Sequence, residues 1–208
     1  MNLDYNEMLD FVYETLKMNK GLKSDKPHLF FRNRYEHIQR VFGWANRILP
    51  GVETCNVDVV LTAAVFHDVG YKDSIGKNHA ALGSQIFETY ALDHAFDLEF
   101  TKKVSNLIQQ HSYKELLHHS DTSIELILLM EADLLDEEGA LGIVFDLLAE
   151  GYKEPESYAS VFNEIMIHSA HIVEQNYMIT PLAKKFWEEK KRFIENFMKD
   201  LKFDLFME

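Results

Sequence analysis

Cysteine and long apolar runs are scarce in this sequence. Cys55 is the single cysteine among 208 residues, so no intramolecular disulfide can form. This excludes the small disulfide-stabilised secreted domains and indicates a reducing compartment. No apolar run reaches the roughly 18 residues of a membrane-spanning helix. Residues 1–9 carry acids and lack the basic start and apolar middle of a signal peptide. We therefore expect a cytoplasmic protein without a membrane partner.

Positive charge is also scarce. The 21 Lys and Arg residues are outnumbered by 34 Asp and Glu residues, and the formal net charge is −13. Such a surface repels the phosphate backbone, which argues against a nucleic acid polymer as partner. It would also repel a small phosphorylated molecule, unless a metal ion or a basic pocket screened the charge locally. The ten histidines are candidate ligands for such a metal.

What the sequence does contain is helical periodicity. Apolar residues make up 47% of the chain and recur at helical spacings, whereas strict alternation is nowhere sustained. We therefore expect an all-α fold, a compact bundle of about eight or nine helices. The main expected helices cover residues 5–18, 34–49, 58–68, 80–90, 98–110 and 124–135.

Two of these helices carry an aspartate among apolar residues that are expected to be buried. Asp68 closes the almost wholly apolar helix 58–68, and Asp133 lies among apolar neighbours in helix 124–135. A carboxylate withdrawn from water costs several kcal/mol unless it is paired or bound to a metal. One cation serving both aspartates would remove that cost.

Two histidines complete a candidate metal site. His37 shares the inward face of its helix with Val41 and Ala45, and His67 precedes Asp68. With Asp68 and Asp133 they form a set of two imidazoles and two carboxylates, which suits Mn, Fe, Co, Ni or Zn better than calcium. A metal held there would lower the pKa of a water molecule toward neutrality and screen phosphate charge.

The order of these residues resembles that of a known family. His37, His67-Asp68 and Asp133 are similar to the H…HD…D signature of the HD-domain metal-dependent phosphohydrolases. The segments 36–41, 67–71 and 131–142 resemble those of small, single-domain bacterial members. The resemblance covers about residues 30–145. It implies one HD domain over residues 1–208, in which about residues 146–208 form a C-terminal helical extension.

The resemblance also implies roles for individual residues. His37, His67, Asp68 and Asp133 would bind one divalent ion (Mn, Fe, Co, Ni, Zn or Mg), and Asp68 would also orient the attacking water or take its proton. Two further histidines, His79 and His111, occupy positions that contact phosphate in one-metal relatives and bind a second metal in two-metal relatives. Lys72 and Lys77 could hold phosphate oxygens. The plainer alternatives are that His79 is a surface histidine, that His111 is an imidazole at a helix C-terminus, and that both lysines are solvated loop residues.

The sequence also departs from the family pattern. Tyr71 stands where some nucleotidase members have a catalytic glutamate, and Asp73 is the nearest acid. Asp146 stands where an arginine commonly follows the glycine at position 142. Glu131 points to another side of its helix than Asp133, and we interpret it as a surface acid or as a support for a ligand.

Three functions are compatible with these observations. The first is a phosphohydrolase for a small phosphorylated substrate, with a nucleotide as the favoured class and a homodimer as an allowed assembly. The second is a binuclear iron oxygenase of the HD type, with His79 and His111 as extra ligands. The third is a nucleotide-binding HD module without turnover, which the absent glutamate and arginine would explain.

Overall fold

The computed structural model describes residues 3–24, 26, 29–72, 76–152, 157–175 and 177–207. Helices dominate these residues, which contain no strand beyond one isolated bridge between Lys23 and Asn33. The α-helices are α1 Tyr5–Met18, α2 Arg34–Ile48, α3 Val57–Phe66, α4 His79–Asp93, α5 Leu98–Gln110, α6 Ile124–Glu137, α7 Ala140–Glu150, α8 Tyr158–Ile165, α9 His171–Glu174 and α10 Pro181–Phe206. A π-helical segment, Met166–Ala170, joins α8 to α9 without a break. If α8, this segment and α9 count as one helix, the described chain has nine, which confirms the predicted all-α bundle.

The helices begin where short polar side chains can accept backbone N–H groups. Asn33 caps α2, and Asn56 caps α3. For α6 the sequence suggests Thr122 as the cap because of its spacing to Glu125, but the structure uses Ser123, whose hydroxyl accepts from the Leu126 N–H. The Thr122 hydroxyl instead donates to the Leu116 carbonyl.

Helix α3 is the centre of the bundle. Every residue from Val59 to Phe66 is buried, and α1, α2, α5 and α6 all pack against the helix. Helix α2 also packs against α6. These packings bring the C-terminal end of α3 together with one face of α2 and one face of α6. None of the helices in the described ranges is long and apolar enough to cross a lipid bilayer.

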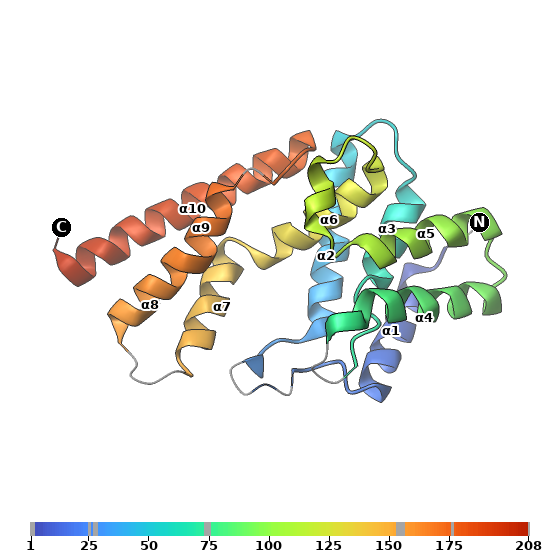
Figure 1. Cartoon of the computed structure of the whole chain (residues 1–208), viewed down its shortest axis with the longest axis horizontal. Helices are drawn as coiled ribbons and strands as arrows, with labels where there is room; N and C mark the ends of the chain where they lie inside the picture. Colours follow the sequence, from blue (N-terminus) through green and yellow to red (C-terminus); the bar gives the residue numbers. More distant parts are fainter. Residues whose placement is uncertain are drawn as a thin grey trace.

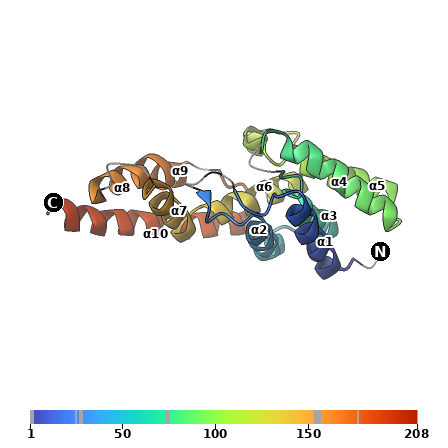
Figure 2. The same cartoon turned by 90° about the horizontal axis from the view of Figure 1, so that it is seen from below.

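The C-terminal helices form one end of an elongated molecule. Figures 1 and 2 both show α7, α8 and α9 lying along α10 at one end, with α1, α3, α4 and α5 at the other and α6 between them. The N-terminal part of α10 is anchored to α6 by Glu131, which is fully buried. Its carboxylate accepts the Ile179 N–H, the Thr180 N–H at 2.8 Å and the Thr180 hydroxyl at 2.6 Å. Glu131 is therefore not a surface acid, because it organises the start of the last helix.

Replacing Glu131 with alanine should destabilise the whole chain. The change would leave the buried Thr180 N–H and hydroxyl and the partly buried Ile179 N–H without partners, which we expect to cost about 3 kcal/mol. For a chain of this length that corresponds to a fall in Tm of roughly 6–12 °C. Glu131→Gln, which keeps one acceptor oxygen, should lose less. If residues 1–208 form one domain, thermal unfolding will remain a single transition; loss of only a C-terminal transition would contradict that expectation.

Candidate metal centre

The four side chains that the sequence singles out converge at one place. His37 comes from α2, His67 and Asp68 follow the last turn of α3, and Asp133 comes from α6; all four are buried. His37 Nε2 lies 3.2 Å from Asp133 Oδ1, 3.5 Å from Asp68 Oδ2 and 3.3 Å from His67 Nε2. His67 Nε2 lies 3.6 Å from Asp68 Oδ2. The donor atoms of His37, His67 and Asp133 are thus close enough together to bind one ion, and Asp68 lies beside the two histidines.

In the histidines at and near this centre, the second ring nitrogen, Nδ1, already makes a hydrogen bond. The Nδ1 atoms of His67, His79 and His111 donate to the backbone carbonyls of Ala64, Gly76 and Ile108 at 2.6–2.8 Å. His37 Nδ1 donates to Asp136 Oδ2 at 2.8 Å. Donation from Nδ1 leaves the lone pair on Nε2 and fixes the ring orientation, which is the arrangement that metal-binding histidines require.

The donor atoms of this centre fit a cation. The Nε2 atoms of His37 and His67 face each other at 3.3 Å. Two nitrogen lone pairs at that distance repel each other unless a proton or a metal ion lies between or beside them. Burial lowers the pKa of His67 to about 4, so this imidazole is neutral near pH 7. Burial also opposes charge on His37, but the bonds to Asp133 and Asp136 outweigh it and raise its pKa to about 9. Without a metal, a proton on His37 therefore supplies the positive charge.

Asp68 faces a second group of donors with its other oxygen. Asp68 Oδ1 lies 3.3 Å from His79 Nε2 and 3.4 Å from His111 Nε2, and the two Nε2 atoms are 3.2 Å apart. His79 opens α4, and His111 follows the last turn of α5. Asp68 thus has one oxygen in each of two donor groups. Among the described residues, one possible ligand group comprises His37, His67 and Asp133, and a second comprises His67, Asp68 and His111.

Sequence reasoning missed two cations at the centre. Arg34 Nη1 lies 2.5 Å from Asp68 Oδ2, and Lys114 Nζ lies 2.6 Å from Asp133 Oδ2. Burial alone would raise the pKa of both carboxyls, but Arg34 and Lys114 hold those pKa values well below the usual range. Arg34 is further held over the ring of Tyr71, 3.8 Å from its centroid. The spacing of Arg34 to His37, one helical turn on the same face, is the signal that could have identified it.

His37 has a supporting residue that sequence reasoning did not identify, Asp136. This carboxylate also accepts two hydrogen bonds from Arg40, at 2.8 and 3.1 Å.

The roles of the two loop lysines stay predictions. Lys72 is exposed and lines neither of the two cavities described below, so its contact with a substrate stays a prediction. The side chain of Lys77 and the whole of Asp73 lie outside the described residues.

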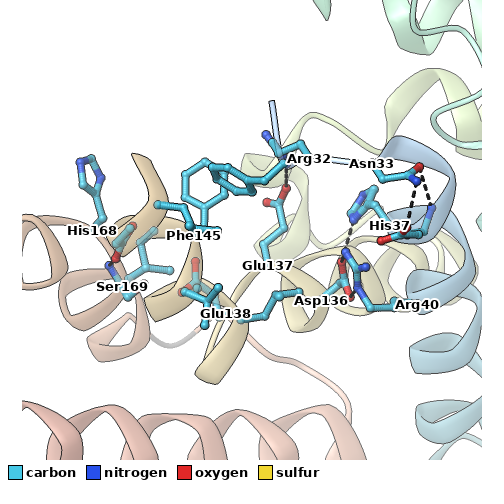
Figure 3. A pocket seen from close by; sticks show the side chains of 18 of the residues that line it. Arg32, Asn33, His37, Arg40, Asp136, Glu137, Glu138, Phe145, His168 and Ser169 are labelled. Carbon is cyan, nitrogen blue, oxygen red and sulfur yellow. Dashed lines mark hydrogen bonds and ion pairs between the residues drawn. The ribbon is translucent and has the colours of Figure 1, made fainter. Parts of the chain in front are cut away.

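A cavity of about 480 Å³ leads away from the metal centre toward α7 and the π-helical segment. Figure 3 shows His37, Asp136 and Arg40 at one end of it, Phe145 and Arg32 in the middle, and Ser169 and His168 at the other end. A smaller cavity of about 240 Å³ shares two lining residues, Arg32 and Arg34, with the larger one. Arg34 therefore belongs to the metal centre and to both cavities.

Comparison with known proteins agrees with this architecture. A predicted HD superfamily hydrolase from an uncultured Thermotogales bacterium is similar to this chain with a TM-score of 0.64 and 24% identity, over 96% of this chain and 91% of that one. Bacillus subtilis YpgQ in complex with ADP is similar with a TM-score of 0.68 and 21% identity, over 96% and 94%. The Lin1889 protein of Listeria innocua has a TM-score of 0.66 and 20% identity, over 98% of both chains.

These likenesses establish the fold. Comparison with curated protein sequences found no match. The sequence model of the HD domain matches residues 34–138, which is 105 of the 208 residues and spans every histidine and carboxylate of the metal centre. The chain belongs to the HD domain family.

Proposed function

We propose that the protein is a metal-dependent phosphohydrolase that acts on a small phosphorylated molecule, with a nucleotide as the favoured class. The observation that carries the proposal is a buried carboxylate, Asp68, surrounded by four histidine Nε2 atoms and paired with Arg34. Such a centre combines metal ligands with a fixed positive charge. Both are what an acidic protein needs in order to hold a phosphate.

Each residue of the metal centre has its own role in this proposal. His37, His67, Asp68 and Asp133 would hold the divalent ion, which supplies a water of lowered pKa and screens the phosphate. Asp68 has an oxygen on each side of the centre, and it would orient the attacking water and take its proton. His79 and His111 would contact a phosphate oxygen or hold a second ion.

Arg34 and Lys114 are the cations that would receive the phosphate. Each is ion-paired with a carboxylate that would also ligate the metal. When Asp68 and Asp133 act as metal ligands, Arg34 and Lys114 would have N–H groups available for phosphate oxygens. Arg34 can offer two parallel N–H donors, a geometry that matches phosphate.

Two observations support a nucleotide as substrate. The larger cavity, about 480 Å³, lies in the range of small-molecule sites, and it has aromatic walls beside the cationic end. Bacillus subtilis YpgQ, which shares the fold, binds ADP in its crystal structure.

The binuclear oxygenase is the second candidate, because His79 and His111 face Asp68 Oδ1 at 3.3 and 3.4 Å. The number and kind of metal ions in the purified protein separate the two. Two irons per chain, with consumption of O₂ and no release of phosphate, would favour the oxygenase. Tight nucleotide binding with neither reaction would favour the module without turnover.

The test is a hydrolysis panel. The metal-free chain is reloaded separately with Mn, Fe(II), Co, Ni, Zn or Mg and incubated with nucleotides and other phosphoesters, and released phosphate and pyrophosphate are measured. Asp133→Asn, purified in parallel, detects contaminating phosphatase. We expect release by at least one loaded form of the wild type and none by the variant. No release by any form, or equal release by the variant, would refute the proposal.

A further inference from the structure

The end of the larger cavity that lies farther from the metal centre is lined by buried polar side chains. Glu138 follows α6, Asp146 lies on α7, and Ser169 lies in the π-helical segment; their exposed fractions are 6%, 4% and 3%. Asp146 Oδ2 accepts the Ser169 N–H at 3.3 Å, so the acid on α7 is satisfied by the segment opposite. A π-helical segment inside a helix is rare and frequently marks a functional site.

Glu138 is not satisfied in this way. Its Oε2 is fully buried and has no hydrogen-bond partner among the described residues. The nearby Lys190 ammonium donates to the Glu138 backbone carbonyl at 2.8 Å. Burial, then the neighbouring acids Glu137 and Asp146, raises the pKa of Glu138 to about 8, with Lys190 opposing the shift. Near neutral pH the Glu138 carboxyl is therefore mostly protonated, and it offers one O–H donor beside one C=O acceptor.

The geometry around Gly142 keeps these polar groups together. A Cβ atom at position 142 would lie 2.8 Å from Ser169 Oγ and 3.2 Å from Glu138 Oε2. Only a residue without a side chain lets α7 approach both groups so closely. An unpaired buried polar atom costs free energy in the absence of a ligand, and a ligand that paired with Glu138 would recover it.

The walls between this end and the metal centre suit a flat ring. Phe31 and Phe145 make an edge-to-face contact with centroids 5.5 Å apart, and the Arg32 guanidinium lies 5.2 Å from the Phe145 centroid. Figure 3 shows Phe145 and Arg32 between the His37 end and the Ser169 end. A ring entering beside them could stack on aromatic or guanidinium planes.

We propose that the part of the cavity lined by Glu138, Asp146 and Ser169 is the subsite for the heteroaromatic base of the phosphorylated substrate, and that Glu138 pairs with an N–H donor and an adjacent acceptor on that base. This inference rests on the proposed function, in which Arg34, beside the metal ligands, receives the phosphate. It deepens that function by naming the recognised group: an amide or amidine edge on a planar ring. Glu138 is then a specificity-determining residue and not a catalytic one.

Equilibrium binding to the metal-loaded full chain tests the proposal. The probes are the four common nucleoside 5′-monophosphates, ribose 5-phosphate, which lacks the base, and phosphoethanolamine, which carries an amine in place of the ring. We expect at least one nucleotide to bind about tenfold or more tightly than ribose 5-phosphate. Equal Kd values for all nucleotides and ribose 5-phosphate, or tightest binding of phosphoethanolamine, would overturn the inference.

Variants of Glu138 sharpen the test. Glu138→Met keeps the volume but removes both hydrogen-bonding groups, so the ratio of the ribose 5-phosphate Kd to the nucleotide Kd should fall about tenfold. Glu138→Gln keeps a donor and an acceptor and should change the ratio by no more than about threefold. Glu99→Gln, at an exposed ion pair on α5, should leave the ratio unchanged. Thermal melts of each variant report folding, and an unchanged ratio in folded Glu138→Met refutes the role.

The two proposals can fail separately. If the wild type hydrolyses phosphoesters but binds ribose 5-phosphate as tightly as any nucleotide, the base subsite is refuted and the phosphohydrolase stands. If no phosphoester is hydrolysed but the affinity ratio is large and collapses in Glu138→Met, the subsite stands and the phosphohydrolase is refuted.

Discussion

Replacing Asp68 with asparagine should lower kcat by about 10³-fold or more and should reduce the metal content of the purified chain. Asp68 is the one side chain with an oxygen in each donor group, near His37 and His67 on one side and His79 and His111 on the other. Asparagine has the same shape but brings no charge. It also directs an NH₂ group toward one pair of imidazoles, where a ligand oxygen is required.

Metal content after dialysis and kcat on one substrate, measured together, check this expectation. His79→Ala is the matched variant, because it removes a donor near Asp68 Oδ1 and leaves the His37, His67 and Asp133 group intact. If the chain binds two ions, His79→Ala should lose one of them; if it binds one ion, the metal content should stay and binding of the phosphate should weaken. An Asp68→Asn chain with full metal content and wild-type kcat would refute the assignment of the centre.

The sequence alone predicts the metal centre because buried charge is conspicuous there. Asp68 and Asp133 stand among apolar neighbours, so each requires a partner, and the helical spacing turns His37 inward. The same reasoning cannot find Arg34 and Lys114. Both follow polar loops, where a cation is expected to be solvated, and their carboxylate partners lie 34 and 19 positions along the chain. Only the packing of α2 on α3, and of the segment after α5 on α6, brings them to the centre.

The larger cavity could not be predicted for a related reason. Its walls come from the segment before α2, the end of α6, α7 and the π-helical segment, and no periodicity encodes how these parts face one another. Asp146 illustrates the difficulty. As a departure from a family pattern it suggests a lost substrate contact, whereas the structure places it, buried, against the Ser169 N–H in the cavity wall. The residue that weakens the functional prediction from sequence is part of the proposed base subsite.

Replacing Arg34 with glutamine should lower kcat/KM by about 10²–10³-fold while metal affinity stays the same or rises. The two effects have opposite signs because Arg34, 2.5 Å from Asp68 Oδ2, would compete with a bound metal ion for that oxygen. Without the guanidinium, Asp68 Oδ2 would be free of its ion pair and would be available to the metal. The substitution also removes the charge that would stabilise the phosphate in the transition state.

Metal affinity by competition with a chelator and kcat/KM on one substrate separate these effects. Arg34→Lys should be intermediate, because it keeps the charge but loses the paired N–H donors and the planar contact with Tyr71. Arg192→Gln, at an exposed position on α10, serves as the control. If Arg34→Gln lost metal in proportion to its loss of activity, Arg34 would be a support for the ligand Asp68 and not a phosphate-binding residue. The Arg34–Asp68 ion pair would then serve to hold the carboxylate, and Lys114, the second cation at the centre, would be left as the candidate for the phosphate.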